Sequence, residues 1–143
     1  MKIFFDTSTL IEIERGNNNT IELMEFLSDK NADLIISIIT VSEILTGVYL
    51  QPQPSKFLLK AKELLGQFHW EDVDGEVAKE TAKLVALRIQ KGKPVDYQDN
   101  LIAATWIVSK SDFLITANQK HYDFETLKGK VYTPINVLRM LKK

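Results

Sequence analysis

Short apolar runs alternate with longer segments of helical periodicity, and this alternation constrains the fold more than any other feature. The runs "KIFF" (2–5), "LIIS" (34–37) and "FLIT" (113–116) are almost continuously apolar, which is typical of strands covered on both faces. "KVY" (130–132) and, more weakly, "HWEDV" (69–73) are further candidates, giving about five strands. Strands that alternate with helices predict an α/β fold with a central, mainly parallel sheet.

Helical periodicity fills most of the chain between these strands. The stretch "QPQPS" (51–55) is too short to separate two cores, and 143 residues with 45% hydrophobic side chains suit one domain. We therefore expect residues 1–143 to form a single domain. The predicted helices lie near 8–15, 20–29, 41–50, 55–66, 75–91, 97–109, 120–127 and 134–142.

The composition excludes several classes of site. There is no cysteine, which rules out disulfides, thiolate zinc sites and a cysteine nucleophile, and suits a reducing cytosol. The 18 basic and 19 acidic residues nearly balance, so any nucleic acid would have to be held by a metal or a local basic cluster. The start "MKIFFDTSTL" lacks the apolar core of a signal peptide, and no apolar run could span a bilayer. We expect a soluble, cytoplasmic protein without membrane contact.

Polar side chains with oxygen ligands follow three of the predicted strands. Asp6 ends "KIFF", Glu43 follows "LIIS" and Asn118 follows "FLIT". Ligands of parallel sheets bind beyond the carboxyl ends of the strands, and the helix near 97–109 could bring Asp99 to the same edge. Three converging carboxylates would repel one another without a cation, and oxygen ligands favour Mg²⁺ or Mn²⁺.

Helix capping is the simpler interpretation of each acid taken singly. "TVSE" (40–43) matches a capping box, and Asp6 could cap a helix that begins at the next residues. Asp96 would be an N-cap with Asp99 in the first turn, and Asn118 could be an ordinary turn residue. Capping does not explain, however, why an acid appears at nearly every strand exit.

Four segments together resemble the PIN-domain family, in particular the small VapC-type toxin ribonucleases of toxin–antitoxin pairs. The segments are "FFDTSTLIE" (4–12), "SEIL" (42–45), "DNLIAATW" (99–106) and "LITANQKHY" (114–122), in the family's order. The resemblance implies a three-layer α/β/α sandwich and one PIN-like nuclease domain. It also implies a metal-dependent endoribonuclease, the toxin of a VapBC-type pair, that hydrolyses RNA phosphodiester bonds.

The family's acidic positions transfer to this chain residue by residue. Asp6, Glu43 and Asp99 match its three acids, which implies that they are catalytic and hold Mg²⁺, with Mn²⁺ as a substitute. Asn118 matches a fourth catalytic position, which is Asp or Asn in the family. A neutral amide oxygen binds Mg²⁺ less strongly than a carboxylate, so the number of ions stays open. Asp96 matches no family acid and is interpreted as a cap.

Other polar residues near these positions have supporting roles in this interpretation. Ser8 and Thr116 match hydroxyl positions that steady the acids, although strand-end hydrogen bonding explains them equally well. Lys93, in the basic cluster "RIQKGK" (88–93), and Lys120 are candidate RNA-binding residues, with a solvated helix end as the alternative for the cluster. His121 is expected to be an exposed loop residue without a catalytic role.

The implied partners are RNA, a small antitoxin that covers the acidic edge, and a second copy of the chain. Leu23, Phe26 and Phe57 could form the antitoxin groove, with core burial as the alternative for each. The competing functions are a PIN-like RNA-binding module without catalysis, and an RNA-processing or DNA nuclease that has no antitoxin. A flavodoxin-like phosphoacceptor domain fits less well, because "FLIT" ends in Thr rather than Asp.

Overall fold

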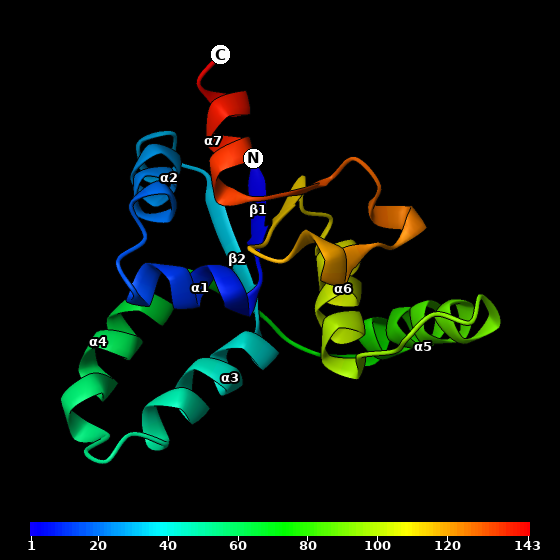
Figure 1. The fold of residues 1–143 in the computed structure, drawn as a ribbon, viewed down its shortest axis with the longest axis horizontal. Coiled ribbons are helices and arrows are strands. Elements are labelled where there is room, and N and C mark those ends of the chain that lie inside the picture. The colour runs from blue at the N-terminus through cyan, green and yellow to red at the C-terminus, as the bar shows by residue number, and fades with distance from the viewer.

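A single five-stranded sheet forms the centre of the computed structural model, which describes residues 1–143 (Figure 1). Every neighbouring pair of strands is parallel, in the order β3-β2-β1-β4-β5. The strands are β1 (Lys2–Phe5), β2 (Asp33–Ser37), β3 (His69–Glu71), β4 (Phe113–Ile115) and β5 (Val131–Tyr132). This confirms the predicted fold class, including the weak candidate strand near residue 69.

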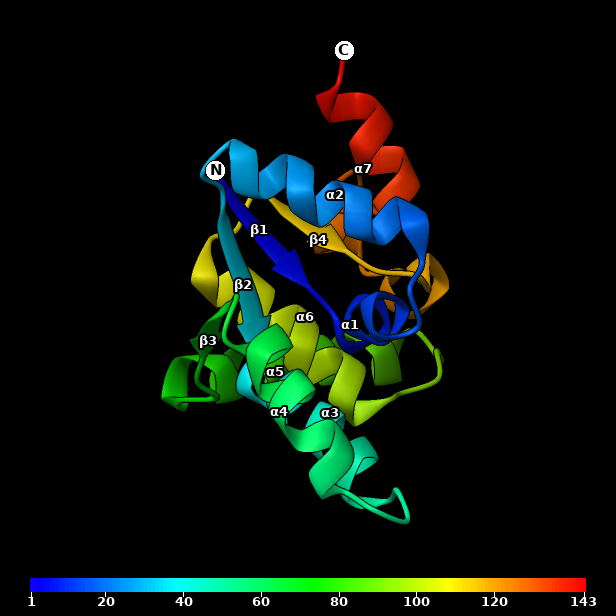
Figure 2. The same cartoon turned by 90° about the vertical axis from the view of Figure 1, so that its left-hand side faces the viewer.

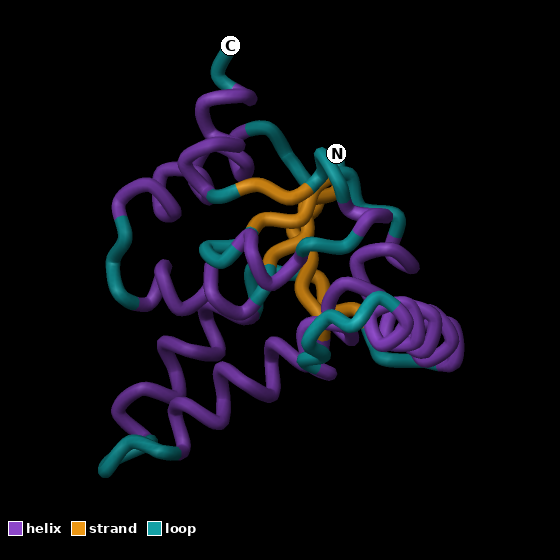
Figure 3. The backbone as a smooth tube through the Cα atoms, turned by 45° about the vertical axis from the view of Figure 1, so that its right-hand side comes forward, coloured by secondary structure: helices purple, strands orange, loops and turns teal.

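Helices cover both faces of the sheet. α5 and α6 pack on one face, while α1, α2, α3, α4 and α7 enclose the other (Figures 1 and 3). No helix combines the length and the apolar character needed to cross a membrane. The helices are α1 (Thr7–Glu14), α2 (Asn18–Asp29), α3 (Ile38–Tyr49), α4 (Ser55–Leu65), α5 (Gly75–Gln90), α6 (Tyr97–Ser109) and α7 (Pro134–Leu141).

The central strands are apolar throughout because successive side chains enter two different cores. Phe4 and Leu114 pack with α5 and α6, whereas Phe5 and Ile115 pack with the helices of the other face. All four side chains are fully buried. The two cores therefore meet only through the strands, and the sheet is the middle layer of the predicted α/β/α sandwich.

The order of the strands creates a switch point between β1 and β4. The chain leaves β1 toward β2 and β3 on one side, then returns to place β4 and β5 on the other side (Figure 2). The backbone N–H of Asp6 donates to the carbonyl of Ile115 at 3.1 Å, which holds the two strand ends together. Ligands of such sheets bind at the carboxyl ends beside this point.

The start of α3 differs from the prediction. The helix begins at Ile38, directly after β2, and the Ser37 side chain caps it by accepting from the Ile39 N–H at 3.1 Å. The capping-box interpretation of "TVSE" is therefore wrong, because Glu43 lies in the second turn. Its carboxylate is free to face the sheet edge.

Residues 120–127 do not form the single helix that was predicted. Two short 3₁₀ helices, η1 (Gln119–Tyr122) and η2 (Glu125–Leu127), occupy this stretch. Phe124 between them has an extended backbone, with φ −86° and ψ 137°. This break lets both Tyr122 and Phe124 bury their rings in the core beneath α5 and α6, which a continuous helix would not allow.

Leu114 tests the importance of the central strands. We expect Leu114→Ala to lower the free energy of unfolding by about 3 kcal/mol, because a fully buried leucine leaves a cavity in the core under α6. Urea unfolding measures the change. Leu59→Ala is the matched control, since Leu59 is 68% exposed and its truncation should cost less than about 0.5 kcal/mol. Equal losses in the two variants would contradict the packing described here.

Candidate active site

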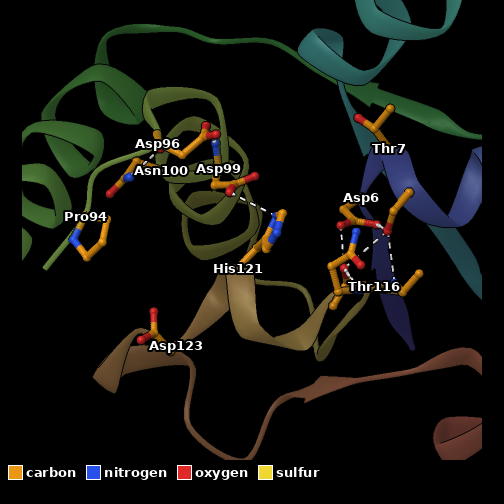
Figure 4. Close-up of polar contacts among 12 residues, drawn as sticks. Asp6, Thr7, Pro94, Asp96, Asp99, Asn100, Thr116, His121 and Asp123 are labelled. Atoms are coloured by element: carbon orange, nitrogen blue, oxygen red, sulfur yellow. Dashed lines mark hydrogen bonds and ion pairs between the residues drawn. The ribbon is translucent and has the colours of Figure 1, made fainter.

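Asp6 is a buried carboxylate surrounded by donors at the carboxyl end of β1. It is only 4% exposed and caps α1 by accepting from the Thr9 N–H at 3.2 Å. The Ser8 hydroxyl donates to one carboxylate oxygen at 2.6 Å, and the Thr116 hydroxyl to the other at 2.5 Å (Figure 4). Burial raises the pKa of Asp6, and these hydrogen bonds oppose the rise. Ser8 and Thr116 thus both contact Asp6, as the resemblance implies.

The same hydroxyls fix the segment after β4. The Ser8 hydroxyl accepts from the Ala117 N–H at 3.0 Å, and the Thr116 hydroxyl accepts from the Asn118 N–H at 3.0 Å. Asn118 therefore begins η1 beside the Asp6 cluster, although its side chain does not cap that short helix. The structure brings Asn118 to the predicted edge of the sheet through its backbone.

Glu43 reaches the same edge from α3. Its carboxylate accepts a hydrogen bond from the Thr7 hydroxyl at 3.0 Å, and Thr7 also contacts the Thr40 hydroxyl at 3.0 Å. Burial raises the pKa of Glu43, and the negative charges of Asp6 and Asp96 raise it further. Thr7 is a residue of the site that sequence reasoning missed. Its position directly after Asp6 was the available signal.

Asp99 faces the site from the first turn of α6. Asp96 caps this helix by accepting from the Asp99 N–H at 3.0 Å, as predicted. The Asp99 carboxylate lies 3.3 Å from Nδ1 of His121 (Figure 4). Burial, followed by the charge of Asp96, raises the pKa of Asp99 to about 6, although His121 opposes the rise. His121 is exposed, as expected, but its contact with Asp99 was not anticipated.

The chemistry of the acids fits a divalent cation, but their present arrangement is not a finished binding site. Besides burial, the charge of Asp6 raises the pKa of both Glu43 and Asp99, and Glu43 adds to the rise at Asp99, as like charges do when no cation neutralises them. No group of three acids or histidines is arranged to hold a metal ion. Glu43 is turned to the Thr7 hydroxyl and Asp99 to His121 instead. The side chains would have to reorient to share one ion.

The candidate RNA-binding residues are in different surroundings. Lys120 forms no ion pair and lines a cavity of about 360 Å³ together with Asp99 and His121. Lys93 lies outside that cavity and contacts Asp123 at 3.5 Å. Lys120 is therefore the more available cation beside the acids.

The three apolar residues predicted for a partner groove also differ in how far they are exposed. Leu23 is fully buried in the core, which confirms the core-burial interpretation and excludes it from a groove. Phe26 is partly buried and packs against the same core. Phe57 is 45% exposed and lines a cavity of about 300 Å³ with Glu43 and Ile44.

The family of the chain follows from comparison with family models. The model described as the PIN domain matches residues 3–127. The chain belongs to the PIN domain family. Members of this family generally use divalent metal ions. No curated protein sequence matches the chain significantly.

Solved structures share this PIN fold over nearly the whole chain. VapBC2 from Rickettsia felis, bound to a DNA fragment from their promoter, matches with a TM-score of 0.83 and 22% identity, covering 93% of this chain and 98% of that chain. DNA-bound VapBC from Salmonella typhimurium matches with a TM-score of 0.81 and 23% identity, covering 94% and 98%. FitAcB from Neisseria gonorrhoeae matches with a TM-score of 0.77 and 25% identity, covering 92% and 97%.

The raised pKa of Asp99 predicts how stability depends on pH without metal. The pKa rises from 3.8 to about 6, so the folded state binds more protons than the unfolded state between these values. Stability from this group therefore falls as pH rises through that window. We expect Asp99→Asn to stabilise the metal-free protein at pH 7.5 by on the order of 1 kcal/mol, allowing for solvent screening.

Thermal melting in EDTA at pH 4.5 and pH 7.5 measures this difference. The gain in Tm should be about 3 °C at pH 7.5 and much smaller at pH 4.5. Comparing wild type with the variant cancels the contributions of Asp6 and Glu43, which follow the same trend. A variant that melts lower than wild type at pH 7.5 would show that the Asp99 charge does not destabilise the fold.

Proposed function

We propose that this PIN domain is a divalent-metal-dependent endoribonuclease and the toxin of a VapBC-type toxin–antitoxin pair. The observation that carries the proposal is that three carboxylates, Asp6, Glu43 and Asp99, lie at the carboxyl edge of the sheet, where the charge of Asp6 raises the pKa of the other two. These residues come from the end of β1, from α3 and from α6, so the fold gathers them from distant parts of the sequence. Carboxylates that repel one another destabilise the site without metal, and a bound cation would relieve this repulsion.

Each acid is prepared differently for its role. Asp6 is held rigidly by Ser8 and Thr116, and would be the fixed ligand. Glu43 and Asp99 are only half-buried and have single contacts, so they can turn toward an ion. The oxygen-only set favours Mg²⁺, with Mn²⁺ as a substitute. Such an ion would lower the pKa of an attacking water and offset charge that develops on the scissile phosphate.

RNA would lie along the cavity beside Asp99. Lys120 lines this cavity and is free of ion pairs, so it would contact the phosphate backbone, with Lys93 farther along the same side. Asn118 is placed close to Thr116 and would contribute a neutral oxygen near the leaving group. Because water is the nucleophile, the products would carry 5′-phosphate and 3′-hydroxyl ends.

The proposed reaction predicts a sharp difference between the two aspartates of α6. Purified protein should cleave RNA with Mg²⁺ or Mn²⁺ and stop in EDTA. Asp99→Asn should abolish cleavage, because the ion loses a charged ligand, while Asp96→Asn keeps a capping oxygen and should cleave normally. End-labelled RNA resolved on gels, with cleavage products mapped at their 5′ ends, measures both effects.

Asp96→Ala is the control for the folding contribution of the cap. It should cost about 1 kcal/mol of stability and leave substantial cleavage. Cleavage that persists in chelator, or is lost in Asp96→Asn and kept in Asp99→Asn, would refute the assignment. Binding of RNA without any cleavage would favour a PIN-like RNA-binding module instead, and cleavage of DNA in preference to RNA would favour a DNA nuclease.

An antitoxin partner is proposed because the similar solved structures are of VapBC and Fit complexes. The cavity of about 300 Å³ between α1, α3 and α4 borders Glu43 and exposes Phe57, so a partner segment seated there would lie next to the acids. We propose that it binds a homodimer of this chain. The cavity also contains Ile11 and Ile44, which suits an apolar segment.

Toxicity tests the partner directly. Induction of the chain alone should arrest growth, induction of Asp99→Asn should not, and co-expression of the small protein encoded next to it should restore growth. Light scattering of the purified complex should give a mass that contains two copies of this chain. Harmless expression of the wild-type chain would remove the basis for a toxin.

A further inference from the structure

Arg88 lies in the last turn of α5, and its guanidinium is engaged on several sides. One terminal nitrogen donates to Oδ1 of Asp123 at 2.7 Å, and Nε donates to the carbonyl of Pro94 at 2.8 Å. The guanidinium also lies 4.8 Å from the centre of the Phe124 ring. Only 13% of the side chain is exposed. Arg88 is thus a largely shielded side chain that connects two segments distant from each other in sequence.

Both connected segments lead to the acidic site. Pro94 lies two residues before Asp96, which caps the helix that carries Asp99. Asp123 lies two residues after His121, whose imidazole contacts Asp99. Arg88 therefore contacts both the segment that leads to Asp99 and the segment that follows His121. The close-up shows Pro94 and Asp123 on the same side of this contact (Figure 4).

Other contacts also support the segment that carries His121, because the Gln119 side chain donates to the Val131 carbonyl at 3.0 Å and the Tyr122 ring is buried. η1 is four residues long and has no side-chain cap, and its next anchor inward is the buried Tyr122 ring. Short 3₁₀ helices have weaker hydrogen bonds than α-helices. Lys93 adds a second contact to Asp123, but at 3.5 Å and with a more exposed side chain. The Arg88–Asp123 pair is thus the charged anchor on the C-terminal side of His121.

These contacts also decide what Arg88 does not do. The sequence interpretation included Arg88 in a basic cluster that could contact RNA. Its donors are directed at Pro94 and Asp123, and the charge of Asp123 neutralises it. Lysine could not replace it, because a single ammonium cannot point along the two directions of a planar fork.

We propose that Arg88 is a positioning residue, which acts on Asp99 by holding His121 and the start of α6 in register. This inference rests on the proposed nuclease function for its kinetic consequence. His121 restrains one oxygen of Asp99, and Arg88 restrains the segment that carries His121 through Asp123. Arg88 also lines the cavity beside Asp99, but its Nε and one terminal nitrogen are engaged by Pro94 and Asp123, so its loss would loosen the site rather than remove a phosphate contact.

The kinetic test compares Arg88→Met and Arg88→Lys with Lys83→Met, a control that removes an exposed cation of the same helix. Both Arg88 variants should lower kcat for RNA cleavage about tenfold and change KM by less than about twofold. Asp123→Asn should have the same effect, and the double variant should be no worse than either single one. In a His121→Ala background, Arg88→Met should cause a smaller further loss than in wild type, because only its contact with Pro94 remains to be removed.

A second measurement does not need activity. The chain has only two histidines, His69 and His121, so the His121 imidazole can be assigned by NMR in the metal-free protein. Its signals should move toward random-coil positions in Arg88→Met, while those of His69 should stay unchanged. If Arg88→Met only lowers Tm, with kcat and the His121 signals unaltered, the proposal is wrong.

Different results would overturn the nuclease function and the positioning role of Arg88. A wild-type protein that cleaves no RNA would overturn the nuclease function, and the His121 signals would still decide whether Arg88 positions this segment. A wild-type protein that cleaves RNA, with Arg88 variants that lose RNA affinity at unchanged kcat, would show that Arg88 contacts RNA and overturn the positioning role.

Discussion

A buried carboxylate has to be matched by donors or by a cation, and Asp6 imposes this requirement on the whole carboxyl edge of the sheet. Three hydroxyl or N–H donors from Ser8, Thr9 and Thr116 satisfy it. The hydroxyls of Ser8 and Thr116 then accept hydrogen bonds from the N–H groups of residues 117 and 118. The ends of β1 and β4 are consequently joined by one polar network, and the path of the chain toward η1 follows from it.

The acids farther from the switch point are bound less firmly. Glu43 and Asp99 each accept or approach one polar partner, and both are only half-buried. This gradient from a fixed to a movable carboxylate suits a site that has to close around an ion. Three rigidly held carboxylates would destabilise the fold by charge repulsion more than the present arrangement does, in which Glu43 and Asp99 are partly exposed.

Local sequence signals predicted the parts of the site that depend on local structure. The apolar runs identified the strands, and the offset between Asp96 and Asp99 identified Asp96 as the cap of α6, while the metal-binding role of Asp99 stays a prediction. The capping box at 40–43 failed because Ser37 caps α3 three residues earlier, a choice that depends on how β2 ends. The break between η1 and η2 was missed because burial of Tyr122 and Phe124 outweighs local helical preference.

Contacts between distant segments could not be predicted. Thr7 reaches Glu43 across 36 positions, and Arg88 reaches Asp123 across 35, so neither pair has a spacing that a motif could contain. The resemblance to PIN domains supplied the acids, because their surroundings recur in short segments. It did not supply Arg88, whose partners come from the loop before α6 and the segment after η1. Such pairs emerge only when the sheet order is known.

The three acids belong to different layers of the fold, so an ion bound at the acidic edge would affect how the layers are held together. Glu43 belongs to the layer built with α3, Asp99 to the layer built with α6, and Asp6 to the sheet between them. An ion shared by these three would be a further cross-link between the two layers, which meet through the strands and through contacts between α3 and α6. Its binding energy would add to the cooperativity of unfolding, because neither layer could detach without releasing it. Whether an ion is bound would then be visible in thermal melting, because the ion-bound protein would unfold in a single transition.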